Sequence, residues 1–111
     1  MKNKLLVEKI LKCVTKLLEY TENVDYEAFE SNTMLVEACV FNLSQIGEYA
    51  NKVDKNFEKA NDGIPWRVLY GLRNKIVHDY EGVNLVLIWE ILKDDLPYLK
   101  EQLLKLYLEL K

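Results

Sequence analysis

The sequence predicts an all-α fold: one up-and-down bundle of four to five helices that spans residues 1–111. Half of the residues are apolar and 30% are charged, which is the balance of a compact domain and not of a disordered chain. Four Gly and two Pro are too few for a sandwich or barrel with many tight turns. A chain of this length has room for one hydrophobic core.

The first half of the chain predicts two long helices with a connector between them. Apolar residues recur every three or four positions over Lys4–Thr21, with lysines between them, which is the pattern of an amphipathic helix. The polar stretch over residues 21–32 interrupts the pattern and predicts a connector with a short helical turn at Tyr26–Phe29. Helical spacing resumes at Met34 and continues to about Val53.

The second half predicts a short element and two further helices. Residues 54–63 alternate in charge and end in Asn-Asp-Gly, so they form a short helix or a loop. Pro65 suits the first turn of a helix that runs to about His78, because the N–H that proline lacks has no partner there. Asn84 is the expected N-cap of the last helix, which Pro97 should kink or restart.

Charge, hydropathy and cysteine content exclude several classes of protein. The formal charge of −3 argues against a protein that mainly coats nucleic acid. The longest apolar run, Leu85–Trp89, is far shorter than the ~20 residues that span a bilayer, and lysines interrupt the basic N-terminus, so neither a membrane segment nor a secretion signal is expected. Cys13 and Cys39 lie within apolar helical patterns, which predicts reduced thiols in the cytoplasm. With one histidine, neither a metal nor another cofactor is expected.

The helix expected over residues 65–78 carries the residues that point to chemistry. At ~100° per residue, its polar and small side chains gather on one face: Arg67, Tyr70, Gly71, Asn74 and His78. The opposite face is apolar: Val68, Leu69, Leu72 and Ile76. The glycine leaves room for another backbone or a ligand, beside groups that can bind anions and transfer protons. The polar face is the predicted site.

His78 is the only histidine, so imidazole acid–base chemistry near neutral pH must run through it. Two structural roles stay open: His78 can be charged near a helix C-terminus, and Arg73 can pair with a carboxylate. On one ideal helix Arg73 and His78 point about 140° apart. Two copies packed around a two-fold axis would bring Arg73 of one chain toward His78 of the other, which predicts a homodimer.

The segment RNKIVHDY, from Arg73 to Tyr80, matches the pattern R-x-x-x-x-H-x-Y. With Ile64-Pro65-Trp66 before it and Gly47-Glu48 earlier in the chain, it resembles the HepT-like toxin family of the HEPN superfamily, over about residues 35–103. The resemblance implies a helical bundle that dimerises with two motif helices facing each other. It also implies a metal-independent endoribonuclease site in the cleft between them.

In that site, the resemblance implies that one His78 takes a proton from a ribose 2′-hydroxyl, whose oxygen then attacks the adjacent phosphate. Arg73 stabilises the developing charge, and Asn74 orients the RNA or the histidine. His78 of the other protomer protonates the leaving 5′-oxygen. The candidate substrate contacts are Arg67, Tyr70 and Lys75.

Tyr80 has a separate implied role as a modification site. In toxin–antitoxin operons of this family, a minimal nucleotidyltransferase (MNT) antitoxin transfers AMP to the motif tyrosine. The added phosphate and adenosine would occupy the phosphate-binding position at Arg73 and block RNA. The residues alone favour a structural role instead, in which Tyr80 covers the core with its hydroxyl in water.

Two other functions remain open at this stage. The chain can be a non-catalytic HEPN module that binds a nucleotide or a partner subunit, or a plain helical dimer with structural polar residues. The net negative charge favours the module, whereas the excess of basic residues between Ile64 and Tyr80 favours an RNA site. Cleavage of RNA that is lost on mutation of His78 separates the enzyme from both alternatives.

Overall fold

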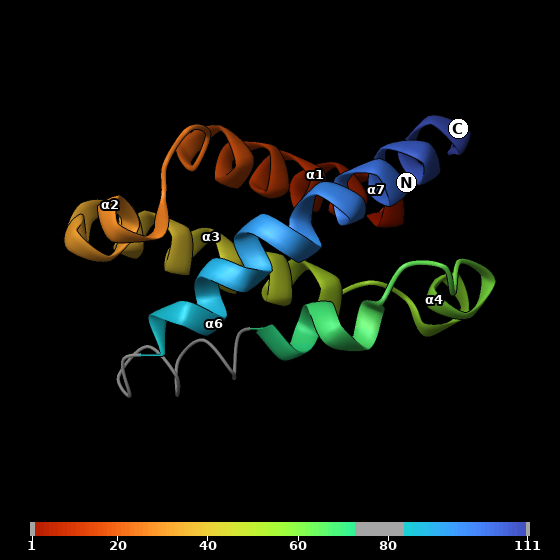
Figure 1. Cartoon of the computed structure of the whole chain (residues 1–111). Helices are drawn as coiled ribbons and strands as arrows, with labels where there is room; N and C mark the ends of the chain where they lie inside the picture. The colour runs from red at the N-terminus through yellow and green to blue at the C-terminus, as the bar shows by residue number, and fades with distance from the viewer. Residues whose placement is uncertain (1, 73–83, 111) are drawn as a thin grey trace.

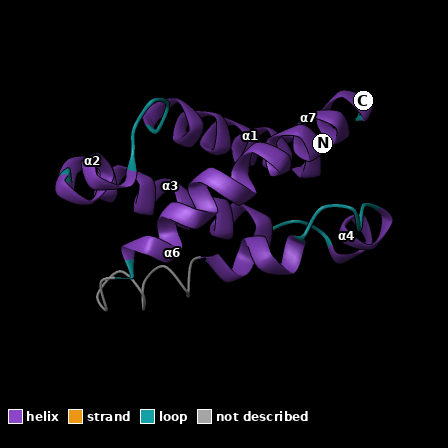
Figure 2. Ribbon diagram, viewed as in Figure 1, coloured by secondary structure: helices purple, strands orange, loops and turns teal. Residues whose placement is uncertain are grey.

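The computed structural model describes residues 2–72 and 84–110, and Figures 1 and 2 show them as helices joined by short turns. Within these two ranges no strand occurs, as the sequence predicts. The expected long helices are α1 (Lys2–Tyr20) and α3 (Thr33–Asn51), which pack against each other along their lengths. The chain ends in α7 (Leu96–Glu109), which also packs on α1.

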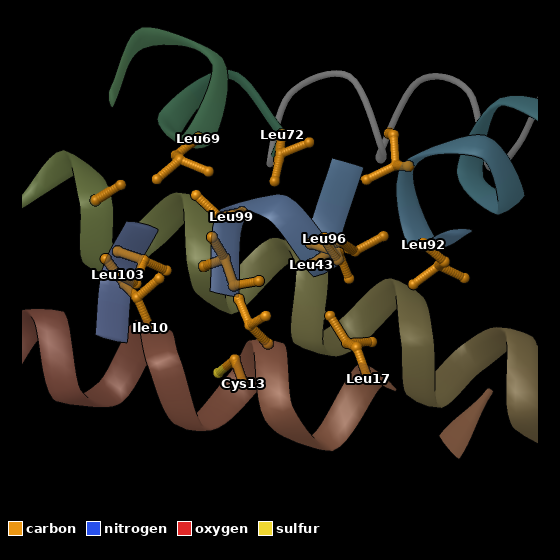
Figure 3. Close-up of a cluster of buried hydrophobic side chains, with 14 of the residues drawn as sticks. Ile10, Cys13, Leu17, Leu43, Leu69, Leu72, Leu92, Leu96, Leu99 and Leu103 are labelled. Carbon is orange, nitrogen blue, oxygen red and sulfur yellow. The ribbon is translucent and has the colours of Figure 1, made fainter. Parts of the chain in front are cut away.

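The core lies where α1, α3 and α7 meet. Each helix contributes the apolar stripe that its periodicity predicts. Ile10 and Leu17 of α1, Leu43 of α3 and Leu103 of α7 are completely buried in it, and Figure 3 shows them side by side. The packing of these stripes therefore determines how the three long helices are arranged.

The connector between the long helices is itself helical. The Asp25 side chain accepts from the N–H of Ala28 at 2.8 Å and begins α2 (Tyr26–Ser31). Asn32 accepts from the N–H of Leu35 at 3.0 Å and begins α3. These two caps satisfy amide groups that the first helical turns leave free, so the predicted short turn is a complete α2.

The apolar side of α2 packs against α6 (Leu85–Glu90). Phe29 is completely buried, and its ring centroid lies 4.9 Å from that of Trp89. Tyr26 meets the same Trp89 edge-on at 6.2 Å. These aromatic contacts hold α2, in the first half of the chain, against α6, in the second half.

Residues 54–63 form a short helix, α4 (Lys55–Ala60), and a turn. Trp66 secures this turn, because its indole N–H donates to the carbonyl of Asn61 at 2.9 Å. The Trp66 ring also meets Phe57 of α4 edge-on at 6.1 Å. Residues 66–72 then continue as helix, so the two contacts define where the helix that leads into the motif begins.

The last helical segment contains a wide turn. Asn84 is its N-cap, as predicted, and accepts from the N–H of Leu87 at 3.3 Å. A π-helix, η1 (Ile91–Asp95), separates α6 from α7, and the N–H of Leu96 donates to the carbonyl of Ile91. Pro97 follows at once and has no N–H for the carbonyl of Lys93, which explains why the regular α-helical pattern is interrupted here. The predicted kink or restart at Pro97 is therefore a restart after a π-turn.

Both cysteines are free and buried, in agreement with the sequence. In the described part of the chain, no helix combines the length and the apolar character needed to cross a membrane.

Candidate functional site

The helical residues 66–72 lead directly into the R-x-x-x-x-H-x-Y motif. Arg73, Asn74, Lys75, His78 and Tyr80 lie outside the described residues, so their roles stay predictions. The candidate site is therefore built from the helix that precedes them and from the elements that pack against that helix.

The described part of this helix has the two faces that the sequence predicts. Leu69 and Leu72 are 2% and 5% exposed, and Figure 3 shows them pointing toward Leu96 and Leu99 of α7. On the predicted polar face Arg67 is exposed, and Tyr70 and Gly71 are half-buried. Packing on α7 thus turns the polar face outward.

Val68 departs from the prediction. The helical wheel groups it with the apolar face, but its side chain is 63% exposed. On an ideal helix Val68 lies at the edge of the apolar arc that adjoins Gly71, whereas Leu72 lies closer to the centre of that arc. The outward surface of this helix therefore carries an apolar residue beside its polar ones.

A groove with a volume of about 820 Å³ lies beside this helix. Its floor is mainly apolar and comes from residues 65–72, from α6, from η1 and from the start of α7: Pro65, Val68, Leu69, Leu72, Leu87, Ile91, Leu96 and Leu99. Five side chains bring charge or hydrogen-bonding groups to its lining: Arg67, Asp94, Asp95, Tyr98 and Gln102. Gln102 donates to the carbonyl of Gly63 at 2.6 Å, which connects α7 to the turn before the helix.

Lys55 and the two aspartates of η1 lie near this helix or line its groove, although no sequence pattern predicts it. The ammonium of Lys55 lies 4.9 Å from the centroid of the Tyr70 ring, a cation–π contact that covers a candidate substrate residue with a positive charge. Asp94 and Asp95 line the same groove as Arg67. No spacing pattern links these positions, because each contact depends on how separate helices pack.

Nucleophilic cysteine chemistry has no support in the structure. Burial raises the pKa of Cys39 to about 11 and also raises the pKa of Cys13, so both thiols stay protonated near neutral pH. Among residues 2–72 and 84–110, no group of three His, Cys, Asp or Glu side chains is placed to hold a metal ion.

Comparison with known proteins gives a consistent result. The family described as "Ribonuclease HepT-like" matches residues 10–106. The chain is 33% identical to "Putative RNase MJ1380" of Methanocaldococcus jannaschii, over 84% of this chain and 85% of that protein. It is 30% identical to "Probable ribonuclease HepT" of Thermococcus cleftensis, over 90% of this chain and 91% of that protein. No solved structure gives a significant match.

The family match covers most of the chain, including the helix at 66–72, the groove beside it and the motif. It agrees with the all-helical structure of the described residues and with the motif from Arg73 to Tyr80. The chain therefore belongs to the HepT-like ribonuclease family.

Proposed function

We propose that this protein is a metal-independent endoribonuclease that acts as a homodimer, as the toxin of a cytoplasmic toxin–antitoxin pair. The observation that carries the proposal is the outward polar surface of residues 66–72, which continues in the sequence into the pair Arg73 and His78. Family membership and the names of the relatives support ribonuclease activity.

The proposed reaction is an internal transfer at one RNA phosphate. The imidazole of His78 removes the proton of a ribose 2′-hydroxyl, and this oxygen forms a bond to the adjacent phosphorus. The bond from phosphorus to the 5′-oxygen breaks, which leaves a 2′,3′-cyclic phosphate and a free 5′-hydroxyl. The Arg73 guanidinium stabilises the added negative charge on the phosphate, and Asn74 orients the reacting groups.

The reaction needs a proton acceptor at one oxygen and a proton donor at the other, whereas each chain has one histidine. A homodimer resolves this, because His78 of the second protomer donates the proton to the leaving 5′-oxygen. The site is then composite and lies between two chains.

The proposed partner is an MNT antitoxin that transfers AMP to Tyr80. Tyr80 follows His78 by two residues, so the new phosphate would stand close to the reacting groups. There it would compete with the RNA phosphate for Arg73.

Cleavage of single-stranded RNA in the presence of EDTA tests the proposal. Wild-type protein should produce 2′,3′-cyclic phosphate ends, and His78→Ala and Arg73→Ala should each lose at least about a hundredfold in rate at unchanged dimer mass. Lys59→Ala, which removes an exposed charge on α4, is the matched control. Full cleavage by His78→Ala would refute the assignment, and nucleotide binding without cleavage by the wild type would favour the non-catalytic HEPN module.

A further inference from the structure

Lys55, the first residue of α4, lies over a residue of the helix that leads into the motif. α4 packs beside the start of that helix, where the rings of Phe57 and Trp66 meet at 6.1 Å (Figure 1). The Lys55 ammonium lies 4.9 Å from the centroid of the Tyr70 ring. Tyr70 belongs to the predicted polar face of the helix. A separate helix therefore adds a positive charge to the face on which the reacting residues are expected.

Glu58, in the next turn of α4, holds Lys55 in this position. Its Oε2 atom lies 3.7 Å from the Lys55 ammonium, and its side chain is 12% exposed. Among the described residues, its other carboxylate oxygen is buried and has no hydrogen-bond partner. A carboxylate removed from water needs a compensating charge, which Lys55 provides. The ammonium is thus kept in place by a ring and by a largely buried charge.

The N–H groups of this ammonium remain free to donate. The distance of 3.7 Å to Glu58 is too long for a hydrogen bond, and within residues 2–72 and 84–110 Lys55 donates to no other group. Lys93 differs, because its ammonium lies 4.8 Å from the Trp89 ring and also donates to a carbonyl. The Lys55 side chain is 67% exposed, so its three N–H groups can reach a ligand.

The chemistry around Lys55 favours a phosphate as this ligand. The neighbouring carboxylates do not leave a free negative charge beside it, because Asp54 pairs with Lys2 at 3.4 Å and Glu58 is largely buried. A nucleobase stacked on this face of Tyr70 would have to displace the ammonium. A phosphate would instead accept hydrogen bonds from the ammonium where it lies.

We propose that Lys55 binds a phosphate of the RNA beside the one that is cleaved, and that Glu58 and Tyr70 position it. The inference rests on the proposed function, because it adds a contact with the same RNA. The sequence predicts that the helix continues to His78, eight residues after Tyr70, which is about 12 Å along its axis. Lys55 therefore serves a flanking phosphate, and Tyr70 supports a substrate contact instead of being one.

The first test measures RNA binding by fluorescence anisotropy in the His78→Ala background, where the strand stays intact. The probe is a labelled single-stranded RNA of about ten nucleotides. Lys55→Gln should raise the dissociation constant by about tenfold and reduce the slope of log affinity against log salt by about 0.7, the share of one phosphate. Lys55→Arg, which keeps the charge, should restore most of the affinity.

Lys59→Gln is the matched control, because it removes an exposed charge from the same short helix without a contact to Tyr70. It should change the dissociation constant by less than about twofold. An unchanged constant in Lys55→Gln, or equal losses in the Lys55 and Lys59 variants, would overturn the proposal.

The second test separates positioning from overall charge. By charge alone, Glu58→Gln should tighten RNA binding, because it removes a negative charge. If Glu58 positions Lys55, the same variant should weaken binding by about threefold, and should add no further loss when Lys55 is already glutamine. Urea denaturation verifies that each variant is folded. Tighter binding by Glu58→Gln would overturn the positioning role.

The third test varies the length of the substrate. A dinucleotide contains only the phosphate that reacts, whereas a longer RNA also carries flanking phosphates. In Lys55→Gln the ratio of kcat/KM for the longer RNA to that for the dinucleotide should fall by about tenfold. Equal losses on both substrates would place Lys55 at the reacting phosphate and overturn the proposal.

These tests also separate the inference from the proposed function. RNA binding that depends on Lys55, in a wild-type protein that cleaves no RNA, upholds the contact and refutes the enzyme. Cleavage that depends on His78, with RNA affinity that is insensitive to Lys55, upholds the enzyme and refutes the contact.

Discussion

Lys93 of the π-helix donates from its ammonium group to the carbonyl of Thr21 at 2.6 Å, across 72 positions of the sequence. The Thr21 hydroxyl donates in turn to the carbonyl of Leu17, in the last turn of α1. The same ammonium lies 4.8 Å from the centroid of the Trp89 ring. Lys93 thus connects the end of α1 with the segment whose aspartates line the groove.

Lys93→Met should lower the free energy of unfolding by about 1–2 kcal/mol, because a partly buried charge-assisted hydrogen bond and a cation–π contact are both lost. Urea denaturation followed by circular dichroism measures the effect. Lys105→Met, at an exposed position of α7, should change stability by less than about 0.5 kcal/mol. Equal effects in the two variants would show that the Thr21 contact contributes nothing.

Trp66→Phe should destabilise the protein by about 1 kcal/mol, since it removes the bond from the indole to Asn61 while an aromatic ring remains beside Phe57. The bond defines where the helix leading into the motif begins, so RNA cleavage should fall as well. Cleavage rates, taken under conditions where both proteins are fully folded, measure the second effect. Loss of stability with full activity would limit Trp66 to a structural role.

Stability should fall in alkaline solution as the Cys39 thiol ionises. Its pKa is raised from 9.0 to about 11 by burial, so the folded state holds the thiol proton more tightly than the unfolded state. The stabilising contribution is complete below pH 9 and is lost as the pH rises from 9 toward 11, by about 3 kcal/mol in total. Urea denaturation at several pH values should show a smaller alkaline loss in Cys39→Ala than in the wild type. If stability fell equally with pH in the wild type and in Cys39→Ala, ionisation of Cys39 would not be the cause of the alkaline loss.

Tyr80→Phe should retain RNA cleavage and escape inhibition by a cognate nucleotidyltransferase, because it lacks the hydroxyl that accepts AMP. Intact-mass spectrometry after co-expression should show one added AMP on the wild type and none on the variant. Tyr20→Phe, which removes an exposed hydroxyl on α1, should be modified like the wild type. Modification of Tyr80→Phe would place the acceptor elsewhere.

Local sequence was sufficient to predict most helical elements. Polar side chains such as Asp25, Asn32 and Asn84 cap the first turns of their own helices, and apolar periodicity marks the buried faces, so both signals lie within a few residues of the structure that they specify. Pro97 also predicts an interruption of the last helix, because proline has no N–H to donate within it. That the interruption takes the form of a π-helix was not predicted. The motif from Arg73 to Tyr80 can also be recognised from consecutive residues, and it indicates the family to which the chain belongs.

The sequence by itself therefore determined the helices, their apolar stripes and the family to which the chain belongs. Only the tertiary structure decided that Val68 is exposed, that Lys55 covers Tyr70, and that Arg67 shares a groove with Asp94 and Asp95. The physical reason is one of range. A helix and its cap depend on residues three or four positions apart, whereas a groove depends on which faces of distant helices pack together, and that is settled by burial of the whole core.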